Sequence, residues 1–488
     1  MRATVLRRRS RLQANVGAVM VLSLLAAACG DSAAGDDGSA AGGGRTVEVV
    51  IGYQSKTINT VTAGTLLRDL GIFEDKLAAL AEKDGNRYRV VWQDYPSGPP
   101  ITAEMLAAKV DIGSMGDYPA LVNGEKTSGI SDAEAALVSI TGYNRRGSLN
   151  GIVVPTTSDA QSLEDLAGKS VSVPFGSAAH GMVVAALDGV GEDDGFVGLV
   201  NQQPEVGATA IESGQVGAVA GFVPWPDLLV FRGVARKVFD GGETETPTMH
   251  AVLMRRAFSG EHPAVARAFL EAQLEATTYL HEHPLDAAQR VADAAGLDVE
   301  VVYLFNGPNG VVTFDPTLKQ EWIDALEGDV PFLRSLGSID DVDLERFVDD
   351  SLLRSIYANY DDDAAEFDNP AILTGEDEAC GGVVDDQSTA SEAWFDGEEQ
   401  TRVSRTPTCL LRLVASEGGP DALRVGYVPD SGHGTRTFAV QATWVDDPSA
   451  EDEDRFKPFA TRGDATTYVE EHPDSAVIDF ASAVEAAA

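Results

Sequence analysis

Cysteine and basic residues are scarce in this sequence. Its 488 residues include 3 cysteines, and 36 lysines and arginines stand against 77 aspartates and glutamates. The formal net charge of −41 gives a surface that repels nucleic acid and anionic lipid headgroups. We therefore expect neither nucleic acid nor the charged surface of a membrane as a partner.

Motifs of familiar catalytic sites are also lacking. The sequence has no phosphate-binding loop, no nucleotide fingerprint and no Ser-His-Asp arrangement. His281 and His283 are two residues apart, whereas the histidines of a helical zinc protease site are four apart. We expect a protein without enzyme activity.

The apolar run at 16–25 is too short for a bilayer span, which takes about 20 residues. Arginines precede this run, and three alanines and Cys29 follow it, which is typical of a signal peptide. The small residues before Cys29 resemble the lipobox of bacterial lipoproteins, whose cysteine is acylated. We predict a signal peptide over 1–28, a lipid anchor on Cys29 and a flexible Gly-, Ala- and Ser-rich tether over 29–45. The alternative is ordinary secretion without the lipid, and both place the protein outside the cytoplasm.

Short apolar runs alternate with helical patterns over most of the chain. Two sets of runs are predicted as strands, at 47–53, 89–92, 110–113, 151–154, 170–173 and 216–222. The βαβ alternation predicts an α/β fold with two lobes and parallel-type sheets. We assign 46–141 and 238–362 to lobe one and 142–237 to lobe two. Gly142 would supply the backbone freedom of a hinge between them.

The last part of the chain has a different pattern. The stretch 363–378 is acidic and turn-rich, so we predict a linker. A small α+β domain is predicted over 379–488. Its expected elements are strands at 391–395, 423–428, 438–445 and 477–479 and a helix at 462–471.

The carboxyl ends of the predicted strands carry the candidate binding residues, because ligands of open α/β sheets bind there. In lobe one these residues are Gln54, Ser55, Ser97, Gly98, Gly116 and Asp117. In lobe two they are Gly176, Ser177, His180, Phe222 and Trp225.

The turn at Gly176 and Ser177 ends a strand and opens directly into a helix. Free backbone N–H groups and the positive end of the helix dipole favour an anion at such a turn. Ser177 would add a hydroxyl, and His180 a hydrogen bond or a charge. The structural alternative makes Ser177 a helix cap and His180 a packed side chain. Asp117 would repel an anion, so it fits a ligand amine or the cap of its own turn.

Several segments together resemble periplasmic substrate-binding proteins of the nitrate, taurine and aliphatic-sulfonate class of ABC importers. They are 49–54, 95–100, 109–113, 116–119, 166–169, 173–180 and the His262-Pro263 helix start. The resemblance implies a two-lobed periplasmic binding protein of type II, which closes about a hinge on a small organic anion. Its ligand would be a sulfonate or taurine, with nitrate or a neutral pyrimidine as alternatives, and its partners an ABC permease and ATPase. It also implies that Ser177 and His180 contact the anionic head.

Cys380 and Cys409 lie in the predicted C-terminal domain, and two interpretations remain open for them. Two cysteines in an exported protein most simply form a disulfide. The segments 394–397, 408–411 and 456–459 weakly resemble the copper-binding accessory lipoprotein of nitrous oxide reductase, which binds copper with a Cys-Gly-Met motif. No methionine follows Met254 here, so a copper site would have to use Cys380, Cys409 and His433. We expect no cofactor, with copper handling or metalloenzyme assembly as the alternative function.

Overall fold

The computed structural model describes residues 44–193 and 195–488. The predicted signal peptide, the lipid anchor on Cys29 and nearly all of the predicted tether lie outside the described residues. Residues 44–488 form one unit. Among the described helices, none combines the length and the apolar character that a membrane span requires.

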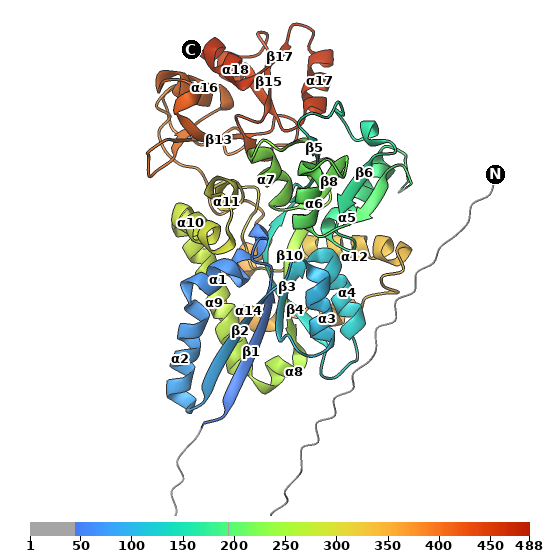
Figure 1. Cartoon of the computed structure of the whole chain (residues 1–488). Coiled ribbons are helices and arrows are strands. Elements are labelled where there is room, and N and C mark those ends of the chain that lie inside the picture. Colours follow the sequence, from blue (N-terminus) through green and yellow to red (C-terminus); the bar gives the residue numbers. More distant parts are fainter. Residues whose placement is uncertain (1–43, 194) are drawn as a thin grey trace, which may run out of the picture. The chain divides into compact units, whose positions relative to one another are not determined.

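Lobe one is built on a five-stranded mixed sheet in the order β2-β1-β3-β10-β4 (Figure 1). β1 is parallel to β2 and β3, whereas β10 is antiparallel to β3 and β4. The strands are β1 (Thr46–Tyr53), β2 (Arg87–Asp94), β3 (Ile112–Gly116), β4 (Ala135–Asn144) and β10 (Thr248–Arg255). The connecting helices are η1 (Ile58–Ala63), α1 (Thr65–Leu70), α2 (Ile72–Asp84), α3 (Gly98–Leu106) and α4 (Asp117–Thr127).

Alternation along β1 explains why helices cover both faces of this sheet. Val47, Val49 and Ile51 pack with residues of α2 and α9 (Pro263–Glu282). Val50 points to the other face and packs with residues of α3 and α4. A strand with apolar residues on both faces is typical of a sheet buried between two helical layers.

Lobe two has the same architecture, with a sheet in the order β7-β6-β8-β5-β9. β6 is parallel to β7 and β8, and β5 is antiparallel to β8 and β9. The strands are β5 (Asn150–Pro155), β6 (Ser170–Val173), β7 (Gly198–Asn201), β8 (Ala218–Phe222) and β9 (Ala235–Asp240). The helices are η2 (Glu164–Leu166), α5 (Ala178–Gly189), α6 (Pro204–Glu212) and α7 (Trp225–Phe231).

The predicted α/β class is confirmed, but neither sheet is purely parallel. The first strand after each crossing between lobes, β5 in lobe two and β10 in lobe one, is antiparallel to its neighbours. Each enters its new sheet from the side of the other lobe, which reverses its direction relative to the local βαβ units.

The chain crosses between the lobes at 145–149 and at 241–247, a few residues beyond the expected boundaries at 142 and 238. β4 continues to Asn144 and β9 to Asp240 because both are held by strand pairing. Gly142 therefore lies inside β4, where a Cβ would come within 2.5 Å of the Val312 side chain, so close packing explains the glycine better than a hinge. Gly147, with φ +102°, is the glycine in the first crossing.

A helical region follows β10 and completes lobe one. Pro263 and Pro284 each open a helix at its first position, where proline sacrifices no intrahelical hydrogen bond. The helices are α8 (Arg256–Glu261), α9, α10 (Pro284–Ala295), α11 (Val299–Asn306), α12 (Gln320–Ser335), α13 (Leu344–Phe347), α14 (Ser351–Ile356) and α15 (Tyr360–Ala365).

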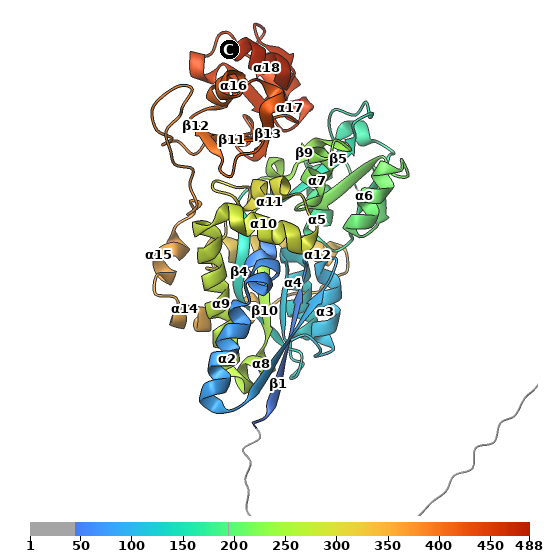
Figure 2. The same ribbon diagram turned by 60° about the vertical axis from the view of Figure 1, so that its left-hand side comes forward.

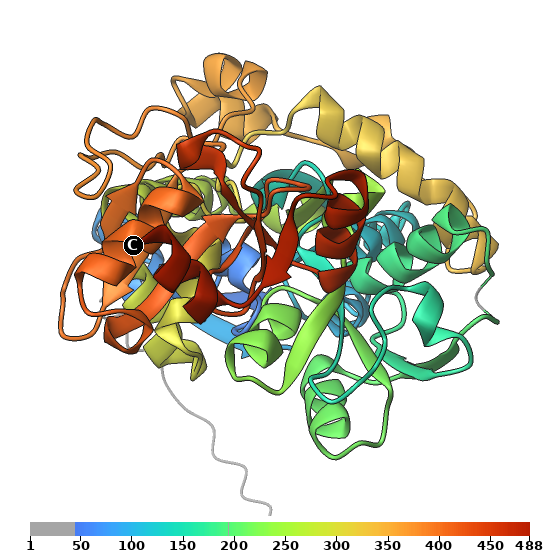
Figure 3. The ribbon, with the colours of Figure 1, turned by 90° about the horizontal axis from the view of Figure 1, so that it is seen from above.

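The C-terminal domain holds two small sheets, in the orders β12-β11-β13-β14 and β16-β15-β17. Its orange and red strands lie nearest to the viewer in Figure 3. The elements are β11 (Ser391–Phe395), β12 (Arg402–Ser404), α16 (Pro407–Ser416), η4 (Pro420–Ala422), β13 (Leu423–Pro429), β14 (Arg436–Phe438), β15 (Thr443–Asp446), η5 (Asp452–Asp454), β16 (Phe456–Phe459), α17 (Arg462–Glu471), β17 (Ala476–Ile478) and α18 (Phe480–Ala487).

Two details of this region differ from the prediction. The expected strand at 438–445 is two strands, β14 and β15, which belong to different sheets. The segment 366–390 runs from α15 to β11 (Figure 2), and Leu373 and Asp377 within it are buried, so it is partly packed rather than a free linker.

The C-terminal domain packs against both lobe two and α11. Phe438 lies 5.1 Å from Phe231 of α7, and Tyr427 lies 5.5 Å from Tyr303 of α11, between ring centroids. The Tyr303 hydroxyl donates to Glu392 at 2.8 Å, and Glu392 forms a buried ion pair with Arg436. A paired and hydrogen-bonded charge of this kind is tolerated in an interface, whereas either charge alone would be costly.

Cys380 and Cys409 form a disulfide, with their α-carbons 5.7 Å apart and 29 residues apart in sequence. It ties the start of the domain to α16.

Replacing both residues (Cys380→Ser with Cys409→Ala) should lower the free energy of unfolding of this domain by about 3–4 kcal/mol, because the unfolded chain loses a closed loop. Denaturant titration measures this loss. Thiol titration of the unreduced, denatured protein should find neither cysteine free, and two free thiols would contradict the bond.

Candidate ligand-binding site

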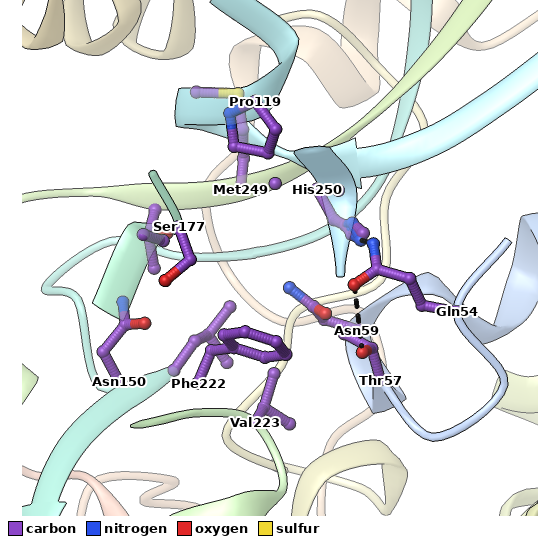
Figure 4. A pocket seen from close by; sticks show the side chains of 15 residues that line it. Gln54, Thr57, Asn59, Pro119, Asn150, Ser177, Phe222, Val223, Met249 and His250 are labelled. Atoms are coloured by element: carbon purple, nitrogen blue, oxygen red, sulfur yellow. Dashed lines mark hydrogen bonds between the residues drawn. The ribbon is translucent and has the colours of Figure 1, made fainter. Parts of the chain in front are cut away.

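A pocket of about 400 Å³ lies between the two lobes. Lobe one and β10 contribute Gln54, Thr57, Asn59, Gly98, Gly116, Pro119, Thr248, Met249 and His250. Lobe two contributes Leu149, Asn150, Ser177, Ala178, Phe222 and Val223. In Figure 4, Ser177 and Asn150 lie on one side of the pocket, Gln54, Thr57 and Asn59 on the other, and Phe222 and Val223 form its apolar floor. Lys56 of lobe one also forms an ion pair with Glu205 of lobe two.

The start of α5 forms one wall of this pocket. Ser177 caps the helix: its Oγ accepts a hydrogen bond from the His180 N–H at 3.4 Å and donates to Pro174 O at 2.6 Å. The N–H groups of Ala178 and Ala179 open the helix, where no intrahelical acceptor exists. These amides and the helix dipole create a site for an anionic group.

His250 and Gln54 form the opposite wall. The Gln54 amide nitrogen lies 3.2 Å from Ser114 O and 3.3 Å from His250 Nε2, so it donates to both. His250 Nε2 is therefore an acceptor, and the ring proton is on Nδ1, which is buried without a partner. Burial lowers the pKa of His250 to about 3, so the ring is a neutral hydrogen-bond donor.

Polar atoms without partners also mark the pocket as a binding site. Asn59 Oδ1 and Asn150 Oδ1 are both buried and unpaired. Such atoms are rare in folded proteins and carry a desolvation cost that a bound ligand removes. None of the described lining residues is a lysine, arginine, aspartate or glutamate. A ligand in this pocket would therefore be held by neutral hydrogen-bonding groups, backbone amides and apolar contact.

Five of the predicted binding residues line this pocket: Gln54, Gly98, Gly116, Ser177 and Phe222. The others, Ser55, Ser97, Asp117, Gly176, His180 and Trp225, lie outside its lining. Ser55 instead binds Asp94 through its N–H at 2.8 Å and its hydroxyl at 2.6 Å. Ser97 precedes α3 and Trp225 begins α7, and both are buried.

His180 and Asp117 have structural partners in place of the expected contact in this pocket. The His180 ring stacks on Phe175 at 4.6 Å, and its Nδ1 accepts a hydrogen bond from the Gly176 N–H at 3.3 Å. Asp117 accepts hydrogen bonds from the Tyr118 N–H at 2.8 Å and the Thr248 hydroxyl at 2.7 Å. The start of α5 thus lines the pocket through Ser177 and Ala178, whereas the His180 side chain one turn along packs on Phe175.

Sequence reasoning missed Asn59, Asn150 and His250. Asn150 begins β5 and His250 lies near the start of β10, whereas the candidate residues were taken from the carboxyl ends of the predicted strands. Asn59 lies in η1, a short helix after β1. The available signal was a polar residue close to a crossing between the lobes.

The structure does not bring His433 to the other two proposed copper ligands, Cys380 and Cys409. The sulfur atoms of Cys380 and Cys409 are bonded to each other, and His433 lies instead with Glu243 and Asp464, whose ligand atoms are within 4.8 Å of one another. His433 Nδ1 lies 3.4 Å from Arg146 Nη2, so the ring accepts from the guanidinium and keeps its proton on Nε2. A protonated nitrogen does not coordinate a metal, so this group fits a hydrogen-bonded contact better.

The pKa of His250 has a consequence for stability. Its folded value of about 3 lies below the usual value of 6.5, so the unfolded chain takes up the proton first. The contribution of His250 to stability is therefore complete above pH 6.5 and is lost as the pH falls below it, by up to about 1.4 kcal/mol per pH unit. His250→Gln should remove this part of the slope of unfolding free energy against pH between 6.5 and 4. His283→Gln, at an exposed helix end, is the control, and equal slopes in wild type and His250→Gln would contradict the neutral ring.

Comparisons with known proteins agree with this architecture. Residues 117–287 match the family model described as NMT1/THI5 like. A putative aliphatic sulfonates-binding protein of Bacillus subtilis (strain 168) is 29% identical over 255 residues, which are 52% of this chain and 72% of the relative. The taurine-binding periplasmic protein of Escherichia coli (strain K12) is 27% identical over 227 residues, 46% of this chain and 68% of the relative.

Among solved structures, the alkanesulfonate-binding protein SsuA of Xanthomonas axonopodis pv. citri, bound to MOPS, superposes with a TM-score of 0.52. The match has 22% sequence identity and covers 62% of this chain and 97% of that one. The resemblance indicated by the sequence is thus confirmed: the chain contains an NMT1/THI5-like region, has the fold of a periplasmic binding protein, and is similar to sulfonate- and taurine-binding proteins.

Proposed function

We propose that this protein is the solute-binding component of an ABC importer and captures a small organic anion of the sulfonate class between its two lobes. The observation that carries the proposal is the N-terminus of α5, whose first residue, Ala178, lines an uncharged pocket between the lobes. The similarity to sulfonate- and taurine-binding proteins supports the same ligand class.

Capture would proceed by rotation of the lobes about the two crossing segments, 145–149 and 241–247. The ion pair between Lys56 and Glu205 would favour the closed arrangement, because it joins the segment after β1 in lobe one to the start of α6 in lobe two. The closed protein would then deliver its ligand to a permease and an ATPase. A lipid on Cys29 and the tether up to residue 45 would hold it at the outer face of the cell membrane.

A ligand screen tests the proposal directly. Calorimetry with ethanesulfonate, 2-aminoethanesulfonate and nitrate, and with a neutral pyrimidine as the non-anionic comparison, should give saturable binding of at least one sulfonate. Ligand-dependent changes in scattering would report closure. Absence of binding by every anion would refute the proposed function.

The contribution of the α5 amides can be measured with a single substitution. Ala178→Pro removes one N–H donor, yet proline is favoured at the first helical position and Ser177 already has the extended conformation that precedes proline. Affinity for the anion should fall about 10- to 100-fold, since hydrogen bonds to charged groups contribute about 1.5–3 kcal/mol.

The matched control is Gln320→Pro, at the first position of α12. Its preceding residue, Lys319, is also extended, and Gln320 is exposed and outside the pocket lining. Both variants should unfold at similar denaturant concentrations. Equal ligand affinity in Ala178→Pro and Gln320→Pro would show that the anion does not use this helix end.

A further inference from the structure

A second space adjoins the ligand pocket on the side of the crossing segments. Its volume is about 330 Å³, and it shares Asn150, Ala178 and Thr248 with the first pocket. The remaining walls come from lobe one, from α5 and from the crossings, and they include Asp117, Tyr118 and Asp329. The two spaces therefore meet at the open end of α5.

Two carboxyl groups in this second space have no cationic partner. Asp117 is 1% exposed and Asp329 is 6% exposed. Three other buried carboxylates have cationic partners, since Asp227 and Asp240 contact Lys237, and Glu392 contacts Arg436. Elsewhere Asp377, Asp430 and Asp447 are buried and accept hydrogen bonds from backbone N–H groups or hydroxyls. Asp117 is held only by neutral donors, and Asp329 by the Tyr118 hydroxyl.

This arrangement is unfavourable without a ligand. Burial raises the pKa of Asp117, and burial together with the nearby Asp117 raises the pKa of Asp329 well above its usual range. Ionising both groups would place two like charges in a region from which water is largely excluded. A cation in the same space would remove that cost.

An independent observation also indicates that a ligand belongs here. Asn150, which lines both spaces, is 5% exposed, and its Oδ1 has no hydrogen-bond partner. Figure 4 shows the Asn150 side chain beside Ser177 at the start of α5. An unpaired acceptor on a residue that lines the same space as two carboxyl groups requires a donor, and a primary ammonium group offers three.

We propose that the second space binds the ammonium group of the ligand, at Asp329, Asp117 and Asn150 Oδ1, while the anionic group of the same molecule lies at the Ala178 and Ala179 amides. The ligand is then a small zwitterion, an amino-substituted organic acid, rather than a simple alkyl anion. This inference rests on the proposed function, because the anionic group is placed by the α5 site.

Matched ligands test the inference on the unaltered protein. Ethanesulfonate, 2-hydroxyethanesulfonate and 2-aminoethanesulfonate share one carbon skeleton and one anionic group. The wild-type protein should bind the amino compound at least 10-fold more tightly than either of the others. Binding of the three with equal affinity, or preference for the unsubstituted anion, would overturn the inference and leave the proposed function intact. If none of the three binds, the proposed function fails and this inference fails with it.

A substitution then assigns the preference to the carboxyl pair. Asp329→Asn keeps the shape and the contact with Tyr118 but removes the charge, so the amino preference should shrink to less than 3-fold while ethanesulfonate binding is kept or strengthened. Asp324→Asn, an exposed position on the same helix, is the control and should leave the preference unchanged. A preference that survives Asp329→Asn would place the ammonium group elsewhere. If that variant fails to fold, the ligand series on the wild type still decides.

Discussion

The two crossings of the chain between its sheets are the constraint on which the binding site depends. Leu149 ends the first crossing and Asn150 begins β5, and Thr248, Met249 and His250 begin β10 after the second crossing. The residues at each crossing therefore line the pocket between the lobes. The end of β9 is fixed by Lys237, which contacts Asp227 at 3.0 Å and Asp240 at 2.9 Å in the interior. Asp240 also caps η3 (Gly241–Thr244) through the Gly242 N–H at 2.9 Å. The second crossing therefore starts from a rigid point rather than from a loose loop.

The C-terminal domain binds to these same crossings. Ser148 contacts Thr435 at 2.6 Å, and Arg146 donates to His433 O at 3.3 Å. On the other side, the Tyr427 hydroxyl donates to Glu300 O of α11 at 2.9 Å. The matched binding-protein structure is covered over 97% of its length by 62% of this chain, which leaves more than a third of the chain outside that fold. Because the added domain contacts both a crossing and a helix of lobe one, any rotation of the lobes must carry these contacts along or break them.

Much of the fold follows from the sequence because strand and helix periodicities are local. The apolar alternation of β1 and the prolines that open α9 and α10 determine their elements without reference to distant residues.

The site was predictable only in part. Strand ends identified Gln54, Ser177 and Phe222, but the direction of a side chain depends on its neighbours: His180 stacks on Phe175, and Ser55 turns to Asp94. Asp329 could not be found from the sequence, because it approaches Asp117 only after α12 packs against α4.

The net charge of the whole protein and the uncharged lining of the pocket together limit the charge of the ligand that can bind. A chain with a net charge of −41 repels an approaching anion, although salt confines this repulsion to about 8–10 Å. A cationic side chain in the pocket would offset that repulsion, but the described lining has none. Attraction of the anionic group must therefore come from N–H dipoles at short range, which the α5 amides and the neutral His250 ring supply. The buried carboxyl pair beside them would oppose a bare anion and would attract a molecule that carries its own positive charge. A ligand with both charges is consequently the one that meets the least resistance at long range and the most complementary groups at short range.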